Sequence, residues 1–250
     1  MSGASSDVLI ARQGAIATIT INRPERRNGV DIALCRSLFE AVREVSMSDA
    51  RVVILRGAGN DFCVGADLRG NGEDQPEPTL EALEPIYHAS TLLMTMPQVT
   101  IAAIDGGCAG AGMGWACACD FRFASHEAKF ATAFLNVGVS GDMGLVWTLT
   151  RIVGAARARE LLLFPEKLDA ASALDIGLVT RLFPRETLHE EVGALARSLE
   201  ERSPFALRMM KANLVSAENL DFAAYIDIES ARHLHVTSGP QFRAGFSRKG

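Results

Sequence analysis

Residues 105–114 have the sequence Asp-Gly-Gly-Cys-Ala-Gly-Ala-Gly-Met-Gly and lie between an apolar run, Val99–Ile104, and an expected helix, Met113–Ala118. A second turn, Phe-Cys-Val-Gly-Ala-Asp-Leu at residues 62–68, comes shortly after another apolar run within Arg51–Arg56. Continuous apolar runs of this length are typical of parallel strands buried on both faces. The two stretches therefore predict an α/β fold in which buried strands are followed by glycine-rich turns.

These two turns have a possible chemical use. Glycines let a backbone turn tightly and approach a ligand closely, and the first N–H groups of a helix lack intrahelical partners. Two such turns aimed at one point would form an oxyanion hole, which stabilises a developing negative charge on oxygen. Each turn taken alone is equally well explained by tight turning and close packing.

Two other glycine-motif sites fit less well. A dinucleotide-binding fingerprint needs a third glycine where Trp115 stands, and a serine-hydrolase elbow needs a final glycine where Asp142 stands. Neither motif is therefore assigned.

Outward from these turns, the pattern predicts one α/β domain over residues 1–250. Val8–Arg12 and Ala15–Ile21 are expected to form a hairpin, and Asp31 is expected to cap a helix over Ile32–Val45. No linker or internal repeat interrupts the chain. Further strands are expected at Phe121–Ala124 and Leu178–Phe183, and further helices at Thr79–Met96, Ala155–Phe164, Ala170–Ile176, Glu186–Arg202, Pro204–Ala217 and Asp221–His235.

Composition excludes several classes of protein. The 250 residues are 48% hydrophobic and carry a net charge of -5, which argues against disorder and against nucleic acid as a partner. No secretory signal and no apolar stretch long enough to span a membrane are found. The five cysteines are expected to be free thiols of a cytoplasmic protein, and no metal is assigned because Cys117 and Cys119 lack a second pair.

Several short motifs follow one another in a set order along the chain. They are Asn22-Arg23-Pro24 with Asn28, the two glycine-rich turns, Cys119-Asp120, Ala128-Lys129-Phe130, Arg151–Gly154 and Ala170–Thr180. In this order and spacing the chain resembles the crotonase (enoyl-CoA hydratase/isomerase) superfamily over about residues 8–250. The resemblance implies a crotonase-like spiral of ββα units over about 1–195 and a helical C-terminal trimerisation region over about 196–250. It also implies an acyl-CoA substrate that supplies the coenzyme A, no permanently bound cofactor, and assembly as a trimer or dimer of trimers.

The resemblance also assigns site residues by position. The oxyanion-hole amides are those of Ala66 and Ala111, which would hold the thioester oxygen and stabilise an enolate. Both roles use the main chain, so alanine is acceptable at either position. The residues expected to bind coenzyme A are Arg23, Arg26, Arg27, Ala66, Asp67 and Leu68, with Phe246 and Lys249 contributed by a neighbouring subunit.

At two positions the sequence departs from the family pattern. Gly114 and Phe134 stand where hydratases carry their two glutamates, and neither residue can transfer a proton. General acid–base catalysis is worth about 10²–10⁴-fold, so ordinary hydration should be crippled. Asp142 resembles the aspartate that dienoyl-CoA isomerases use as a proton carrier, and we expect it beside Phe134 and Trp147. Its alternative role is to cap the following helix.

Two functions remain open from the sequence. The first is an isomerase- or lyase-type acyl-CoA enzyme in which Asp142 transfers the proton. The second is a catalytically reduced acyl-CoA-binding protein of the same fold. His88 is either a surface residue or an active-site histidine. The stretch from Gly70 to Pro85 is expected to line the acyl channel, but it does not identify the acyl group.

Overall fold

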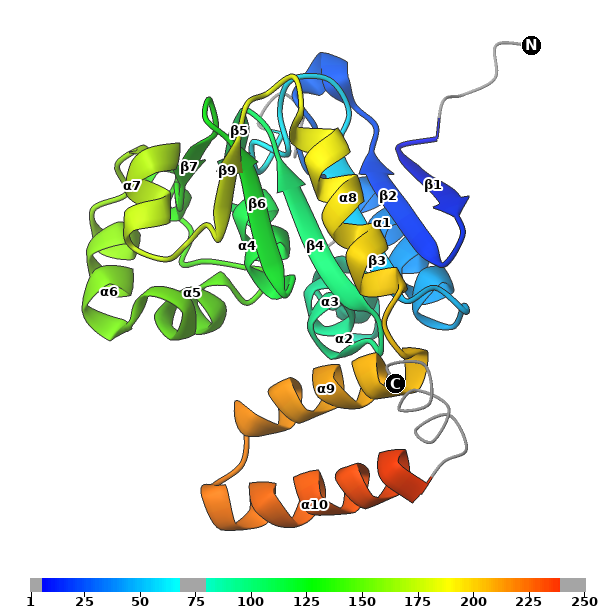
Figure 1. Ribbon diagram of the computed structural model, residues 1–250. Helices are drawn as coiled ribbons and strands as arrows, with labels where there is room; N and C mark the ends of the chain where they lie inside the picture. The colour runs from blue at the N-terminus through cyan, green and yellow to red at the C-terminus, as the bar shows by residue number, and fades with distance from the viewer. Residues whose placement is uncertain (1–5, 68–79, 239–250) are drawn as a thin grey trace.

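The computed structural model describes residues 6–67 and 80–238, and its centre is a six-stranded sheet (Figure 1). The strand order is β1-β2-β3-β4-β6-β9. β1 pairs with β2 in antiparallel fashion and every other neighbouring pair in this sheet is parallel. The strands are β1 (Val8–Gln13), β2 (Ile16–Ile21), β3 (Val52–Gly57), β4 (Val99–Ile104), β6 (Phe121–Ser125) and β9 (Arg181–Phe183).

A second, three-stranded sheet stands beside the first and has the order β5-β7-β8. Its strands are β5 (Gly107–Ala109), β7 (Lys129–Ala131) and β8 (Leu168–Asp169). The chain passes from β4 to β5 through only Asp105 and Gly106, so the glycine-rich turn links the two sheets directly.

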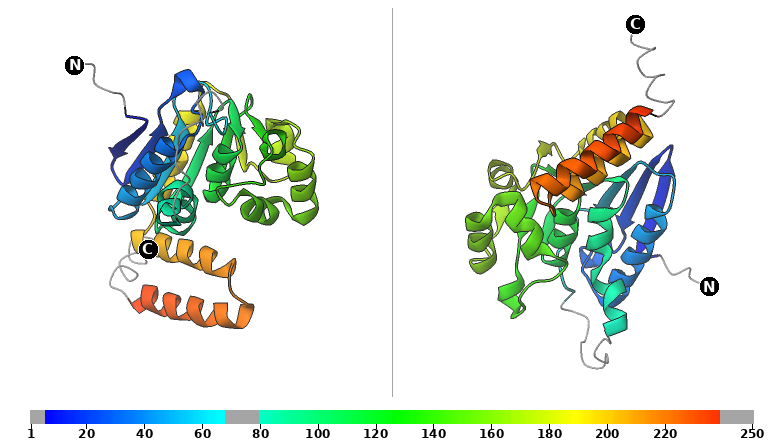
Figure 2. Two further views of the ribbon diagram at one scale, coloured as in Figure 1. Left: turned by 180° about the vertical axis from the view of Figure 1, so that it is seen from behind. Right: turned by 90° about the horizontal axis from the view of Figure 1, so that it is seen from below.

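Helices cover both faces of the large sheet (Figures 1 and 2). On one face lie α1 (Ile32–Ser46), α2 (Leu80–Tyr87), α3 (Ala89–Thr95) and α4 (Ala111–Ala118), and on the other lies α8 (Leu188–Glu200). Each face has its own apolar cluster, the smaller one formed where α8 packs on the strands. Around the small sheet lie α5 (Leu145–Val153), α6 (Ala155–Leu163) and α7 (Ala170–Asp175), and two 3-10 turns occupy Pro24–Arg26 and Phe134–Val137.

The last two helices, α9 (Pro204–Ala217) and α10 (Phe222–Ser238), run side by side across one end of the core (Figure 2). Lys211 fixes α9 to the core: its side chain is only 3% exposed, and its Nζ lies 2.5 Å from Oδ1 of Asp120. Large apolar side chains of this pair remain exposed, among them Met210, Leu214, Phe222 and Leu234.

Most predicted elements are confirmed. The hairpin turns at Gly14, and the Asp31 side chain accepts a hydrogen bond from the N–H of Leu34 as the α1 cap. The helix expected over Thr79–Met96 is instead two helices, α2, which contains Pro85, and α3, and its first residue lies outside the described ranges. The helix expected at Met113 begins two residues earlier, at Ala111.

Three further features of the described residues are the state of the cysteines, the clustering of possible metal ligands and the apolar length of the helices. All five cysteines are free and buried. Within residues 6–67 and 80–238, no three His, Cys, Asp or Glu side chains gather closely enough to hold a metal ion. Among the helices of those same ranges, none combines the length and apolar character needed to cross a membrane.

Candidate active site

The two glycine-rich turns lie side by side in parallel register. The N–H of Cys63 donates to the carbonyl of Gly107 at 3.0 Å, and the N–H of Ala109 donates to the carbonyl of Cys63 at 2.9 Å. The register pairs Cys63 with Cys108. The same register continues two residues later, because a Cβ built on Gly110 would lie 3.5 Å from the Cα of Gly65. That distance is an ordinary contact, but a Cβ built on Gly65, whose φ is +87°, would lie 3.1 Å from the carbonyl oxygen of Ala109, so the close approach favours glycine at position 65.

This register places the peptides that carry the amides of Ala66 and Ala111 next to each other. On its other side the first turn pairs with Val30. The N–H of Val30 donates to the carbonyl of Gly65, and the carbonyl of Val30 accepts from the N–H of Asp67. Successive N–H groups of an extended chain point to opposite sides, so the N–H of Ala66 points away from Val30. Ala111 is the first residue of α4, where an N–H has no intrahelical acceptor.

Neither amide has a partner in the described part of the chain. Among the described residues, the N–H groups of Ala66 and Ala111 donate no hydrogen bond. Buried backbone donors are seldom left unpaired, and Ala111 is only 4% exposed, whereas Ala66 is exposed. Two free donors on adjacent turns form a place for an oxygen that carries negative charge.

Asp61, which the sequence analysis did not single out, holds the two turns together. Its Oδ1 accepts from the N–H of Gly107 at 2.7 Å, and its carboxylate also receives two hydrogen bonds from Arg27, at 2.8 and 3.0 Å. The hydrogen bonds from Arg27, and to a lesser degree the one from Gly107, lower the pKa of Asp61. Buried Asn28 donates to the carbonyls of Ala58 and Asp61 and so fixes the same loop.

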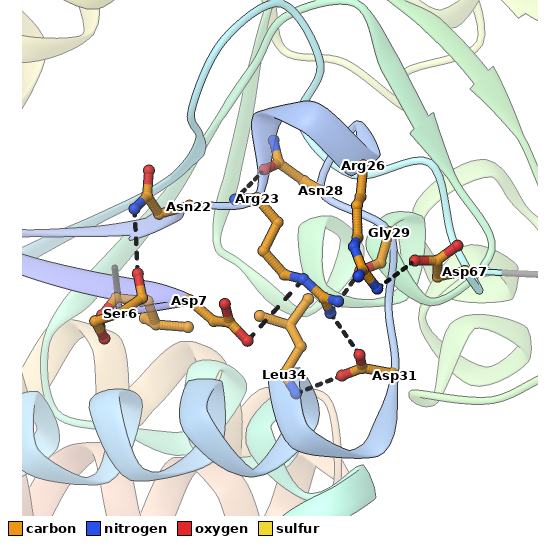
Figure 3. A network of polar contacts seen from close by, with 11 residues as sticks. Ser6, Asp7, Asn22, Arg23, Arg26, Asn28, Gly29, Asp31, Leu34 and Asp67 are labelled. Atoms are coloured by element: carbon orange, nitrogen blue, oxygen red, sulfur yellow. Dashed lines mark hydrogen bonds and ion pairs between the residues drawn. The ribbon is translucent and has the colours of Figure 1, made fainter. Parts of the chain in front are cut away.

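The three arginines expected to contact coenzyme A have different environments, and Figure 3 shows two of them, Arg23 and Arg26. Arg23 is buried: its side chain is 7% exposed and is paired with Asp31 at 2.8 Å, and it donates to the carbonyl of Gly29. It therefore braces the start of α1 and is not directed at solvent. Arg26 pairs with Asp67 at 3.2 Å but stays 47% exposed, and Arg27 is 63% exposed.

The exposed sides of Arg26 and Arg27 are thus available at the rim of the first turn. The Asp67 carboxylate that pairs with Arg26 is itself buried, with the side chain 3% exposed. The other expected contacts, Leu68, Phe246 and Lys249, lie outside the described residues.

Asp142 is partly buried and lacks a hydrogen bond at one oxygen. Its Oδ1 is inaccessible to solvent and has no partner in the described part of the chain, and desolvation by burial raises the pKa of the carboxyl. The capping alternative is not what the structure shows. Helix α5 has Gly144 at its N-cap with no side-chain hydrogen bond, and Leu145 donates to the main-chain carbonyl of Asp142.

Asp142 also lies near the first turn. Burial raises the pKa of the Cys63 thiol to about 12, and the charge of Asp142 contributes to that rise. The carboxylate therefore lies within electrostatic reach of Cys63, in the turn that leads to Ala66. Burial and Asp142 act in the same way on Cys35 of α1, whose pKa is also about 12.

The comparisons with known proteins agree with this geometry. The profile of the enoyl-CoA hydratase/isomerase family matches residues 11–249. The chain belongs to the enoyl-CoA hydratase/isomerase (crotonase) superfamily. It is 33% identical over 237 residues to the Escherichia coli (strain K12) 1,2-epoxyphenylacetyl-CoA isomerase, covering 93% of this chain and 90% of that protein. It is also 33% identical to the rat mitochondrial Delta(3,5)-Delta(2,4)-dienoyl-CoA isomerase, covering 85% and 71% of the two chains.

A solved structure shows the same fold with an acyl-CoA ligand. An enoyl-CoA hydratase-type protein from Thermobifida fusca YX, crystallised with acetoacetyl-CoA, superposes with a TM-score of 0.86 at 27% identity and covers 93% of this chain and 95% of its own. The expected α/β crotonase fold, with its two sheets and C-terminal helices, is thereby confirmed. Acyl-CoA thioesters are ligands of this superfamily, and its members include hydratases and isomerases.

The ring of Phe134, a residue that the resemblance predicted at a hydratase glutamate position, lies between the two glycines Gly110 and Gly141. A Cβ built on Gly110 would be 3.8 Å from this ring, and one built on Gly141 would be 3.9 Å from it. The side chain is 7% exposed. An apolar ring therefore separates the oxyanion turn from the turn that carries Asp142.

Two expected neighbours of the site are placed elsewhere. Trp147 stacks on Arg151 at 3.5 Å and lines a cavity of about 390 Å³ with residues of α4 and α9. His88 lies exposed at the junction of α2 and α3, where its ring is 3.4 Å from the hydroxyl of Thr91. Among the described residues, Asp142 is the ionisable side chain with a buried oxygen that has no hydrogen-bond partner.

Proposed function

We propose that this chain is an acyl-CoA isomerase that moves a proton along the acyl chain with a single carboxylate, that of Asp142. The observation that carries the proposal is the buried, unpartnered Oδ1 of Asp142 beside two adjacent turns with unsatisfied amides. The two relatives described above are named as isomerases, which supports the same reaction class.

The reaction begins with the thioester oxygen between the amides of Ala66 and Ala111. The Asp142 carboxylate takes a proton from the carbon α to the thioester, and the electron pair moves into an enolate whose oxygen those amides stabilise. The protonated Asp142 then returns the proton to the γ carbon, and the double bond moves into conjugation with the thioester. Nothing is gained or lost overall, as an isomerisation requires.

The environment of Asp142 suits this cycle. A general base works best when its pKa approaches the pH of operation, and burial raises the pKa of this carboxyl from its ordinary value. Phe134 and Gly114 supply no group that could activate water, so the enolate is protonated on carbon by Asp142 and no water is added to the double bond.

Coenzyme A binding and assembly complete the proposal. The exposed guanidinium groups of Arg26 and Arg27 would contact the phosphates of coenzyme A at the rim of the first turn. The exposed apolar residues of α9 and α10 would be covered in a trimer or a dimer of trimers. A mass measurement by light scattering on the full chain tests the assembly. The cytoplasmic location stays a prediction, and one of the relatives is named as mitochondrial.

The reaction is tested with three substrates in parallel. A Δ3-enoyl-CoA and a Δ3,5-dienoyl-CoA should each gain the ultraviolet absorbance of a thioester-conjugated double bond, while crotonyl-CoA should not be hydrated appreciably. Asp142→Asn should lose the isomerisation by about 10²–10⁴-fold. Fast hydration of crotonyl-CoA, or undiminished isomerisation by Asp142→Asn, would contradict the proposal.

Binding separates the enzyme from the alternative acyl-CoA-binding protein. Acetoacetyl-CoA is an enolisable thioester, so an oxyanion hole should increase the enolate absorbance of the bound ligand. If the native chain binds acetoacetyl-CoA but isomerises neither test substrate, the binding protein is the correct assignment.

A further inference from the structure

The turn that carries Asp142 rests on Gly114 of helix α4. A Cβ built on Gly114 would lie 2.6 Å from the Cβ of Met143, 3.3 Å from its carbonyl oxygen and 3.5 Å from its Cα. Real Cβ atoms essentially never approach another heavy atom closer than 3.0 Å. The contact is to the base of the methionine side chain and to its main chain, so no rotation of that side chain would relieve it.

The shape of this turn is unusual and well packed. Met143 has a φ of 50°, in the left-handed region, and is 4% exposed, while the flanking Gly141 and Gly144 also have positive φ. A buried residue in the left-handed region persists only where its surroundings hold it there. On the opposite side Gly141 lies against Phe134 and Val146. The turn is therefore held between the helix at Gly114 and the ring of Phe134.

We propose that Gly114 is a positioning residue for Asp142, because the missing side chain at position 114 gives the turn its place beside the oxyanion amides. The proposal rests on the function given above, in which Asp142 carries the proton. In this chain, a Cβ at position 114 and the observed position of the Met143 main chain exclude each other.

The required movement can be read from the distances. Ordinary contacts at a Cβ are 3.4–4 Å, so a methyl group on Gly114 must push Met143 away by about 1 Å. Misplacement of a reacting group by this amount can cost about 10²-fold in rate. The adjacent carboxylate would move with the turn and leave its buried position.

Four variants test the proposal. Gly114→Ala introduces the clash, Met143→Gly removes the atom that meets it and tolerates the same φ, and the double variant combines them. Gly193→Ala is the matched control, because in α8 the new Cβ would meet only the flexible end of Arg197 at 3.3 Å. Isomerisation of a Δ3,5-dienoyl-CoA is measured with kcat and KM separated, over a range of pH.

We expect Gly114→Ala to lower kcat by about tenfold to a hundredfold with little change in KM, since the binding groups stay in place. The acidic limb of its kcat profile should move to lower pH, because the displaced carboxylate is better solvated. The double variant should recover kcat to near the Met143→Gly value. Gly193→Ala should match the native chain.

Several results would overturn the inference. They are an unchanged kcat in Gly114→Ala, effects of the two changes that simply add in the double variant, or an unshifted pH profile. If Gly114→Ala does not fold, the comparison of the double variant with Met143→Gly decides, since a clash with Met143 predicts equal kcat there. Undiminished turnover in Asp142→Asn would instead refute the proposed function, whatever Gly114 does.

Discussion

Asp142→Asn should stabilise this protein while it removes the activity. The buried Oδ1 has no partner among the described residues, and burial raises the pKa of the carboxyl above the 3.8 of an ordinary aspartate. At neutral pH the fold therefore holds a partly desolvated negative charge. Asparagine has nearly the same shape and carries no charge, so it removes that cost.

The magnitude follows from the unsatisfied oxygen. A buried acceptor without a partner costs about 1–3 kcal/mol, and asparagine keeps part of this cost because its amide is also polar. We expect a net gain of about 1 kcal/mol in the free energy of unfolding at neutral pH. For a chain of this length that is about 2–4 °C in Tm.

The pH dependence of the stability difference gives an independent check that Asp142→Asn is the more stable chain at neutral pH. Because the native pKa is raised, the folded state keeps the proton to higher pH than the unfolded chain does. The contribution of this carboxyl to stability is complete below the unfolded pKa and is lost as pH rises through the native pKa. The advantage of Asp142→Asn should therefore grow from acidic to neutral pH and be small at about pH 4.

Urea unfolding of the native chain and Asp142→Asn at several pH values measures the difference. Asp31→Asn is the control, because it removes an ion pair with Arg23 while asparagine keeps the helix cap. A lower stability of Asp142→Asn at neutral pH, or a difference that does not change with pH, would refute the reasoning. Retained isomerisation by the variant would refute the catalytic role.

Three further perturbations test other parts of the structure. Arg23→Met leaves Asp31 and the buried carbonyl of Gly29 without their donor, so the free energy of unfolding in urea should fall by about 1–3 kcal/mol. Arg12→Met, at an exposed ion pair, is the control and should change it by less than about 1 kcal/mol. Ala111→Pro removes one of the two proposed oxyanion N–H groups at the first position of a helix, which accepts proline. The kcat should fall about 10²–10³-fold while the circular dichroism spectrum stays unchanged. An unaltered kcat would show that this N–H does not contribute to catalysis. Lys211→Met leaves one oxygen of Asp120 without its cation, so amide hydrogen exchange in α9 should become faster while exchange in the large sheet stays unchanged. Exchange rates in α9 equal to those of the native chain would contradict this anchoring role.

Part of the candidate site could be predicted from the sequence because its signals are local. The glycines of the two turns, the apolar runs before them and the alanines at 66 and 111 have fixed spacing along the chain. The α4 boundary was predicted two residues late, because Gly110 and Gly112 obscure the helix start, and that boundary decides that Ala111 has a free N–H. The role of Asp61 in joining the two turns could not be predicted from neighbouring residues, because its partners Arg27 and Gly107 are distant in the sequence.

The sequence by itself determined the superfamily, the strands of the large sheet, most of the helices, and the residue types at positions 114 and 134, because these depend on residue identity and periodicity along the chain. Only the tertiary structure decided that Arg23 is a buried brace, that Oδ1 of Asp142 has no partner among the described residues, and that Gly114 packs against the turn beside it. Burial, pairing and steric contact are properties of residues brought together from distant parts of the chain. The same aspartate could cap a helix or carry a proton, and the packing around it determines which.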